Sequence, residues 1–413
     1  MWTTFVSLRY RNYRLIWTSM LFSSTGQWME QVALSWLVWT LTEDPFMLGA
    51  INGTRALPFI LSPLAGVAAD RIDRKKLMIT TQFGVMLLSF SMSLLVYSGL
   101  IRLWMVFVFA ILAGTTWAFN QPVRQAIIPN LVPKKHIMNA VALGSSAMNM
   151  TRLIGPIGAG FIIAMVGVEG AFAGKGVAYI AVIVMTFFVR VPPIVDRATR
   201  LGIRQDLWSG FNYIWNNRMI FTLLVMALIP IVLVMPYIWS FMPVFADQVY
   251  DMGPEGMGIL YGAVGLGALG GSLTVASLGS FRQKGLLLML SGIVMGAMLI
   301  LFGMSTYFPL TLLVLVGVGF PQTFYNSLTQ TLIQMNITDD VRGRVMSILM
   351  LDRGLGPLGS FFAGFMASIV GAPGAVIIGG SITFVLAILG FIFMPNIRKW
   401  DYNVPMAEVS NNS

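Results

Sequence analysis

The sequence predicts an all-α membrane protein with twelve transmembrane helices in two six-helix halves. Three observations lead to this prediction. Of the 413 residues, 57% are hydrophobic and only 10% are charged, long apolar runs recur along the chain, and basic residues collect in alternate gaps between the runs. Soluble domains carry about 25% charged residues, so the composition places this chain in a membrane. Apolar segments of about 20 residues are the units to identify.

Each apolar run is long enough to cross a bilayer as a helix, which satisfies its own backbone hydrogen bonds in lipid. The predicted spans of the first half are 13–41, 46–69, 77–100, 103–129, 137–165 and 171–191. Those of the second half are 219–246, 254–278, 285–305, 307–335, 343–370 and 373–394. We therefore expect an N-terminal half at 1–191, a cytoplasmic linker at 192–218, a C-terminal half at 219–394 and a cytoplasmic tail at 395–413.

Basic residues indicate the orientation of these spans. With a cytoplasmic N-terminus, most Lys and Arg residues fall in inside segments, and the outside segments hold only Arg102 and Lys175. This is the positive-inside pattern, and an even number of spans puts both termini in the cytoplasm. We expect a multi-pass protein of a bacterial cytoplasmic (inner) membrane.

The linker contains apolar residues at helical spacing. Leu207, Phe211, Ile214 and Trp215 recur on one face, with basic residues on either side. This pattern predicts a short amphipathic helix at the cytoplasmic interface. The alternative is a solvated linker.

The composition excludes several classes of site. The chain has no cysteine and one histidine, which argues against thiolate or His-based metal centres and against a Ser-His-Asp hydrolase. The net charge of +10 is explained by cytoplasmic loops, so no nucleic-acid partner is expected. The sequence contains no P-loop. We expect no cofactor, no metal, no enzymatic activity and a monomer.

The two halves share a pattern. "RLIGPIG" at 152–158 matches "RGLGPLG" at 353–359, and Ser146 and Phe161 match Ser347 and Phe362 at the same offset. Paired six-span repeats predict a binding site between the halves near the membrane midplane, with alternating access.

Two motifs suggest a family. The loop "GVAADRIDRKK" at 66–76 resembles the signature loop of the major facilitator superfamily, with Asp73 in place of its second glycine. The "GPIGAG" stretch at 155–160 resembles a motif of that superfamily's exporter branches, with Ala159 replacing a glycine. Its small residues permit close helix packing, and its proline bends or weakens the helix. The helix-packing residues are Gly155, Pro156 and Gly160.

Longer stretches resemble the branch that contains the enterobactin exporter and the macrolide efflux pumps. They include "RALPFILSPLAGVAADRIDRKKLM" from Arg55 and "QPVRQAIIPNLVP" from Gln121. The resemblance implies the major facilitator fold and proton-driven efflux of an organic molecule. It does not extend to the span-4 relay of drug–proton antiporters, because Arg102 is followed by "LWMVFVFAILAG". Family analogy also implies a cytoplasmic gate formed by Gly66, Asp70, Arg71, Arg74, Lys75 and Arg124.

Six ionisable residues lie within the predicted spans or at their inner ends: Glu30, Arg55, Arg124, Arg152, Asp352 and Arg353. A charge inside a membrane costs roughly 2.5–3.5 kcal/mol on insertion scales and usually faces a partner or a cavity. Glu30 and Arg55 lie about 16 and 13 Å from the outer ends of spans 1 and 2. We predict that they form an ion pair. Asp352 and Arg353 are adjacent, so we expect them to contact different neighbours.

Polar residues form stripes on four predicted helices. The stripes contain Gln27 with Glu30, Asn52 with Arg55, Asn149 with Arg152, and Gln322 with Asn326. They predict an aqueous central cavity; helix–helix hydrogen bonding is the alternative.

The leading functional hypothesis is a secondary active exporter of an amphipathic siderophore, macrolide or drug-like compound. Glu30 is the candidate proton carrier if Arg55 moves away, since burial favours the neutral acid. The alternatives are a lipid or lysolipid flippase of the same fold, a non-transporting ligand sensor and a membrane-embedded enzyme.

Overall fold

The computed structural model describes residues 5–61, 73–190, 211–278, 283–337 and 352–398, with five further residues between 341 and 349. Every regular element in these ranges is a helix. Two compact units divide the chain: Met1–Ala198 with Met242–Gly262, and Thr199–Phe241 with Ala263–Ser413. The boundaries predicted for the two halves and the tail stay predictions.

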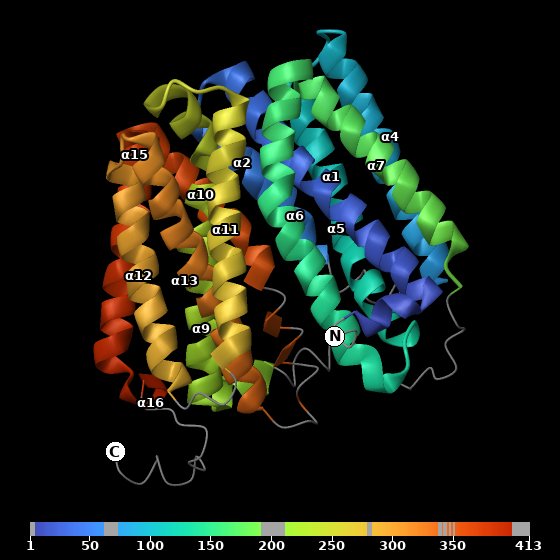
Figure 1. Ribbon diagram of the computed structural model, residues 1–413. Coiled ribbons are helices and arrows are strands. Elements are labelled where there is room, and N and C mark those ends of the chain that lie inside the picture. Colours follow the sequence, from blue (N-terminus) through green and yellow to red (C-terminus); the bar gives the residue numbers. More distant parts are fainter. Residues whose placement is uncertain are drawn as a thin grey trace. The chain divides into compact units, whose positions relative to one another are not determined.

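In the described residues, the first unit begins with six α-helices and four short 3₁₀ turns (Figure 1, blue to green). The elements are η1 (Val6–Arg9), α1 (Arg11–Thr42), α2 (Pro45–Ala56), η2 (Leu57–Leu61), α4 (Arg74–Tyr97), α5 (Leu103–Ile127), η3 (Ile128–Asn130), η4 (Lys134–His136), α6 (Ile137–Val166) and α7 (Val168–Phe188). Helix α1 packs against α6 and α7, and α4 packs against α5 and α7. The polar helix α1 is thus held on several sides by apolar neighbours.

After α7, the described chain continues through α9 (Arg218–Leu233), α10 (Met235–Val244), the π-helical turn η5 (Phe245–Val249) and α11 (Pro254–Leu278). These elements are divided between the two units. The second unit also contains α12 (Lys284–Met304), α13 (Phe308–Met335), η6 (Asp352–Leu355), α15 (Gly356–Phe393) and α16 (Pro395–Arg398). Within it, α12 packs along α13 and α15 (Figure 1). The buried Tyr325 hydroxyl donates a hydrogen bond to the Met226 carbonyl at 3.0 Å, which joins α13 to α9.

Local sequence explains the helix boundaries. Asp44 caps α2 by accepting a hydrogen bond from the Phe46 amide at 2.8 Å, with Pro45 at the first helical position. Asp73 caps α4 by accepting from the Lys76 amide at 2.9 Å. Gly167, with φ of 91°, alone separates α6 from α7, a backbone conformation that glycine adopts without strain.

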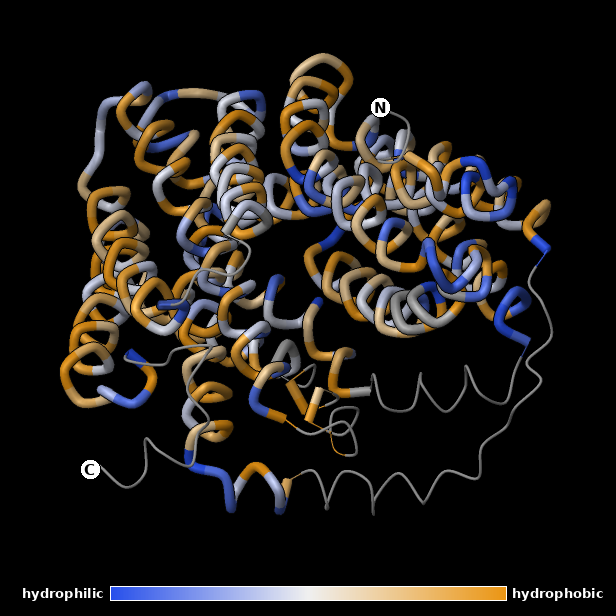
Figure 2. Tube along the Cα trace, turned by 60° about the horizontal axis from the view of Figure 1, so that its bottom comes forward, coloured by the Kyte–Doolittle hydropathy of each residue, from blue (hydrophilic) through white to orange (hydrophobic). Residues whose placement is uncertain are grey.

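Long apolar helices dominate the part of the chain that the structure describes, and nine of them are long and apolar enough to cross a membrane. Figure 2 shows apolar residues along the helices and hydrophilic residues concentrated toward many of their ends. Gly371, with φ of 75°, interrupts α15 between the last two predicted spans. The all-helical membrane fold is confirmed, and the count of twelve spans stays a prediction.

Residues 211–216 at the end of the predicted linker are helical, and 191–210 lie outside the described residues. The rings of Phe211 and Trp215 are exposed and stack with centroids 6.0 Å apart, whereas Ile214 is buried. Two of the predicted apolar residues are thus on the surface of their helix, in keeping with an interfacial segment.

The packing motif of α6 contains three glycines in different surroundings. A β-carbon added at Gly155 would lie 2.7 Å from the Trp28 β-carbon, whereas one added at Gly158 would meet nothing within 4 Å. Gly160 packs against the backbone of Pro254 and Gly258 in the same unit. Pro156 lies inside the helix and is buried.

We predict that Gly155→Ala lowers the free energy of unfolding by about 1–3 kcal/mol, because overpacking forces α1 and α6 apart. Gly158→Ala is the matched control and should be neutral or stabilising by up to about 1 kcal/mol, since alanine favours helix more than glycine. Thermal unfolding of the purified variants measures both. Equal melting temperatures for the two variants would contradict the packing role.

Candidate functional site

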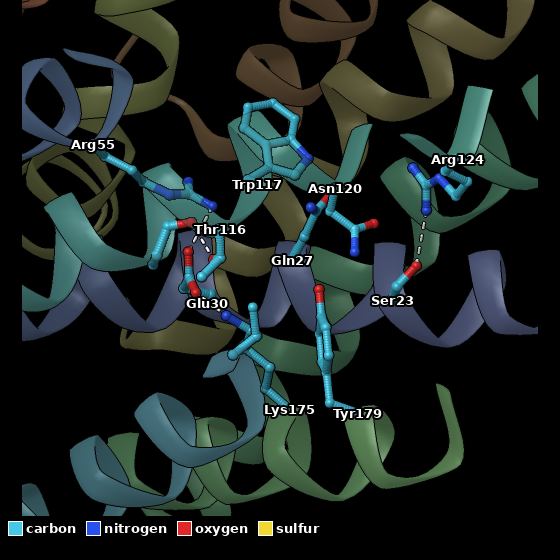
Figure 3. Close-up of a pocket in the computed structure, with 12 residues that line it drawn as sticks. Ser23, Gln27, Glu30, Arg55, Thr116, Trp117, Asn120, Arg124, Lys175 and Tyr179 are labelled. Carbon is cyan, nitrogen blue, oxygen red and sulfur yellow. Dashed lines mark hydrogen bonds and ion pairs between the residues drawn. The ribbon is translucent and has the colours of Figure 1, made fainter. Parts of the chain in front are cut away.

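A polar pocket lies inside the first unit, between α1, α2, α4, α5 and α7 (Figure 3). Its lining residues are Ser23, Gln27, Glu30, Arg55, Val85, Ala113, Thr116, Trp117, Asn120, Arg124, Lys175 and Tyr179. The cavity is small, about 20 Å³. It has room for one or two water molecules or one small functional group. Three of the lining residues are basic and one is acidic.

Glu30 is the centre of the charged cluster. Its side chain is 3% exposed, and its Oε1 lies 2.8 Å from an Arg55 guanidinium nitrogen. Its Oε2 accepts a hydrogen bond from the Lys175 ammonium, whose side chain is also 3% exposed. Figure 3 shows the carboxylate between these two cations. The predicted Glu30–Arg55 ion pair is therefore confirmed as a contact, and its role in transport stays a prediction.

Lys175 corrects the sequence analysis, which assigned it to an outside segment. Helix α7 begins at Val168 directly after the Gly167 turn, so Lys175 lies two turns, about 10 Å, along the helix. Its stem passes Gly26 of α1, where an added β-carbon would lie 3.1 Å from Lys175 Cγ. The sequence places Lys175 close to the predicted start of the span at 171, where a lysine looks like a loop residue. The sequence-based prediction therefore paired Glu30 with Arg55 alone.

Aromatic rings surround the Lys175 ammonium. The nitrogen lies 5.8 Å from the Phe109 ring centroid and 5.6 Å from that of Tyr179. Both distances are within the range of cation–π attraction. The two neutral rings thus stabilise the ammonium of Lys175, and the Glu30 carboxylate supplies the opposite charge.

A second network supports Arg55 on its other side. The guanidinium donates to the side-chain oxygen of Gln31, and the amide of Gln31 donates to the Asn52 side chain at 3.0 Å. The same amide lies 3.3 Å from the Ser35 hydroxyl. Asn52 therefore helps to hold Arg55 through Gln31 and is not among the residues lining the pocket. Sequence reasoning missed Gln31, although it directly follows Glu30.

Arg124 lies toward the other end of the pocket from Arg55 (Figure 3). Its side chain is buried, and it donates to the Ser23 hydroxyl at 3.1 Å. Its predicted gate partners Gly66, Asp70 and Arg71 lie outside the described residues. Lys75 and Arg74 begin α4, where the Lys75 ammonium donates to the Phe187 carbonyl at 2.6 Å. The gate stays a prediction.

The remaining predicted site residues lie elsewhere. Asn149 and Arg152 are half-buried on α6 and do not line this pocket. Gln322 of α13 is buried and donates to the Met235 sulfur at 2.9 Å, whereas Asn326 is exposed. Asp352 and Arg353 belong to η6, and their side chains lie outside the described residues.

Sequence reasoning also missed a polar stripe on α5. Thr116, Asn120 and Arg124 recur every fourth residue, and all three line the pocket. Lys175 and Tyr179 show the same spacing on α7. The i, i+4 rule identifies both sets of positions once polar residues inside spans are sought on every helix.

Comparison with known proteins identifies the family. The model of the transmembrane secretion effector family, a group of major facilitator superfamily transporters, matches residues 2–411. The chain belongs to this family. The superfamily assignment made from the sequence is confirmed, and the family is one of transporters and not of enzymes.

Individual relatives carry related descriptions. The chain is 28% identical to a staphyloferrin A transporter of Staphylococcus aureus over 84% of this chain and 87% of the relative. It is 22% identical to macrolide efflux protein A of Streptococcus pyogenes over 95% and 99%. It is 25% identical to a putative bacilysin exporter of Bacillus subtilis over 76% and 79%.

Solved structures share the fold. The nucleoside transporter NupG aligns over 93% of this chain and 98% of its own with a TM-score of 0.72 and 14% identity. A D-xylose–proton symporter aligns over 92% and 97% with a TM-score of 0.73 and 13% identity. The chain is therefore a multi-pass membrane transporter of the major facilitator fold.

We predict that Glu30→Gln lowers the free energy of unfolding by about 3–5 kcal/mol, because it leaves the buried Lys175 and the half-buried Arg55 without their counter-ion. Lys175→Met should remain close to wild type, since it leaves one carboxylate with one guanidinium. Glu43→Gln, at the exposed end of α1, is the control for the chemical change. Thermal unfolding in detergent measures all three, and a Glu30→Gln protein as stable as wild type would refute the role of Glu30 as counter-ion.

Proposed function

We propose that this transporter is a secondary active exporter of an amphipathic organic molecule, driven by proton exchange through alternating access. The observation that carries the proposal is the buried Glu30–Arg55–Lys175 cluster, which lines a pocket among the transmembrane helices of a transporter family. Ionisable groups buried within spans are characteristic of substrate paths and proton relays.

The direction of transport is taken from the relatives. Two of them are described as a macrolide efflux protein and a putative bacilysin exporter, and a third as a staphyloferrin A transporter. Their described substrates are small organic molecules of different chemistry. An exporter of a small amphipathic compound is the function that this set supports.

Glu30 supplies a route for coupling. While both cations contact it, its carboxylate is held in the charged form. Movement of Arg55 or Lys175 away from it during the transport cycle would favour proton uptake. In this proposal the ion pairs are opened and remade once in each cycle, and the cluster links proton binding to the conformation of α1, α2 and α7.

The whole-chain architecture belongs to the same proposal. We propose the full set of twelve spans, a bacterial cytoplasmic membrane as the location, both termini in the cytoplasm and a monomeric transporter. The basic segments between the spans support this orientation.

Flux into proteoliposomes tests the function. We expect an imposed pH gradient to drive uptake of at least one labelled compound from a panel of siderophores, macrolides and peptide antibiotics. Abolishing the gradient should reduce the initial rate at least about tenfold if proton movement supplies the driving force.

Two variants test the coupling residue. Glu30→Gln should lose the dependence on the gradient while Glu43→Gln keeps it, with size-exclusion profiles confirming that both are folded. Flux that ignores pH in the wild type, or full gradient dependence in Glu30→Gln, would reject the coupling. Ligand binding with no flux at all would favour the sensor alternative.

A further inference from the structure

The charged cluster of the pocket is unbalanced. Glu30 provides one negative charge, and both of its oxygens are engaged, one by Arg55 and the other by Lys175. With all three groups ionised, the cluster carries one net positive charge. Two of the three side chains are 3% exposed, and Arg55 is 20% exposed. A net charge at such a site is strongly unfavourable unless another group compensates for it.

Among the residues that the structure describes, the immediate neighbours do not remove this excess. Arg55 donates a hydrogen bond to the neutral amide oxygen of Gln31. Lys175 faces the neutral rings of Phe109 and Tyr179. Dipoles and rings lower the energy of a cation but carry no formal charge. Arginine does not lose its proton in proteins, so an anionic ligand is the direct way to balance the cluster while Lys175 stays charged.

The pocket beside the cluster fits such a ligand. Its space suits one functional group, and Arg55, whose side chain is 20% exposed, is one of the residues that line it. A planar guanidinium binds a carboxylate through two parallel hydrogen bonds, and a lysine adds a point charge. Gln27, Asn120 and Tyr179 supply neutral polar groups to the same pocket, and Trp117 supplies an aromatic ring.

We propose that Arg55 and Lys175 bind a carboxylate group of the exported molecule, which acts as the second counter-ion of the cluster. This inference rests on the proposed transport function and specifies its substrate class: amphipathic compounds that carry at least one carboxylate. The apolar part of such a molecule extends from the pocket past Trp117. A compound whose only charge is a cationic amine is repelled by the same cluster.

Matched ligands test this proposal with the purified full-length protein. The probes are 4-phenylbutyrate and 4-phenylbutyramide, which have nearly the same shape and differ in charge. Isothermal titration should show that the acid binds at least tenfold more tightly than the amide, a difference of about 1.4 kcal/mol. Equal binding of the two, or no binding of the acid, would overturn the proposal.

The variants give opposite shifts. Lys175→Met should weaken binding of the acid at least tenfold, while Lys134→Met, which removes an exposed lysine outside the pocket, leaves it unchanged. Glu30→Gln should strengthen binding, because the competing carboxylate is gone. Glu30 in a merely structural role would give no such gain. Weakened acid binding in a folded Glu30→Gln protein, or unchanged binding in Lys175→Met, would contradict the assignment.

Chloride separates a substrate site from a general anion site. 4-Phenylbutyrate should stay bound in the presence of excess chloride. Chloride that binds as tightly as the acid and displaces it would overturn the substrate assignment. Flux distinguishes this inference from the proposed function. Gradient-driven export of neutral or cationic compounds only would support the proposed exporter function and refute the carboxylate site. Binding of the acid without any flux would support the carboxylate site and refute the exporter function.

Discussion

The Glu30 carboxylate, held between the Arg55 guanidinium and the Lys175 ammonium, is the interaction on which the site depends. It joins three helices, α1, α2 and α7, at a depth where lipid and protein offer little other solvation for charge. A buried ion pair contributes little net stability compared with apolar packing, but breaking one is expensive. The cluster therefore fixes how these helices approach one another, and any motion that separates them must supply another partner for each charge.

The surrounding fold makes this cluster possible. Gly26 leaves room on α1 for the stem of Lys175, and the Gly167 turn starts α7 close enough to place that lysine two turns into the helix. Gln31 and Asn52 hold Arg55 from the other side. On this account, the low hydropathy of α1 follows from its function: it carries the polar face toward which the more apolar helices of the unit are packed.

Much of the fold could be predicted from the sequence, because apolar run length and basic gaps are strong signals in a membrane protein. The span ends predicted around α1, α6 and α13 lie within a few residues of the helix ends found. The Glu30–Arg55 pair could also be predicted, because a short turn joins the two antiparallel helices and the two residues lie at similar depth. Lys175 was not, because a lysine near a span end looks like a loop residue until the start of α7 is fixed by Gly167.

The polar stripe of α5 was missed for a different reason. Thr116 and Asn120 stand beside Thr115 and Gln121 in an otherwise apolar span, and each is equally compatible with a local helix–helix hydrogen bond. Only the arrangement of α1, α5 and α7 brings them to one pocket with Arg124 and Tyr179. Residue spacing defines a helix face, but tertiary packing decides which faces meet.

The most direct test of this account is the unfolding free energy of the Glu30→Gln/Lys175→Met double variant, set against both single variants. If Lys175 is the excess cation of a cluster that depends on Glu30, its removal should recover a large part of the stability lost in Glu30→Gln, and the double variant will be more stable than that single variant. A double variant whose loss equals or exceeds the sum of the two single losses would contradict the central claim.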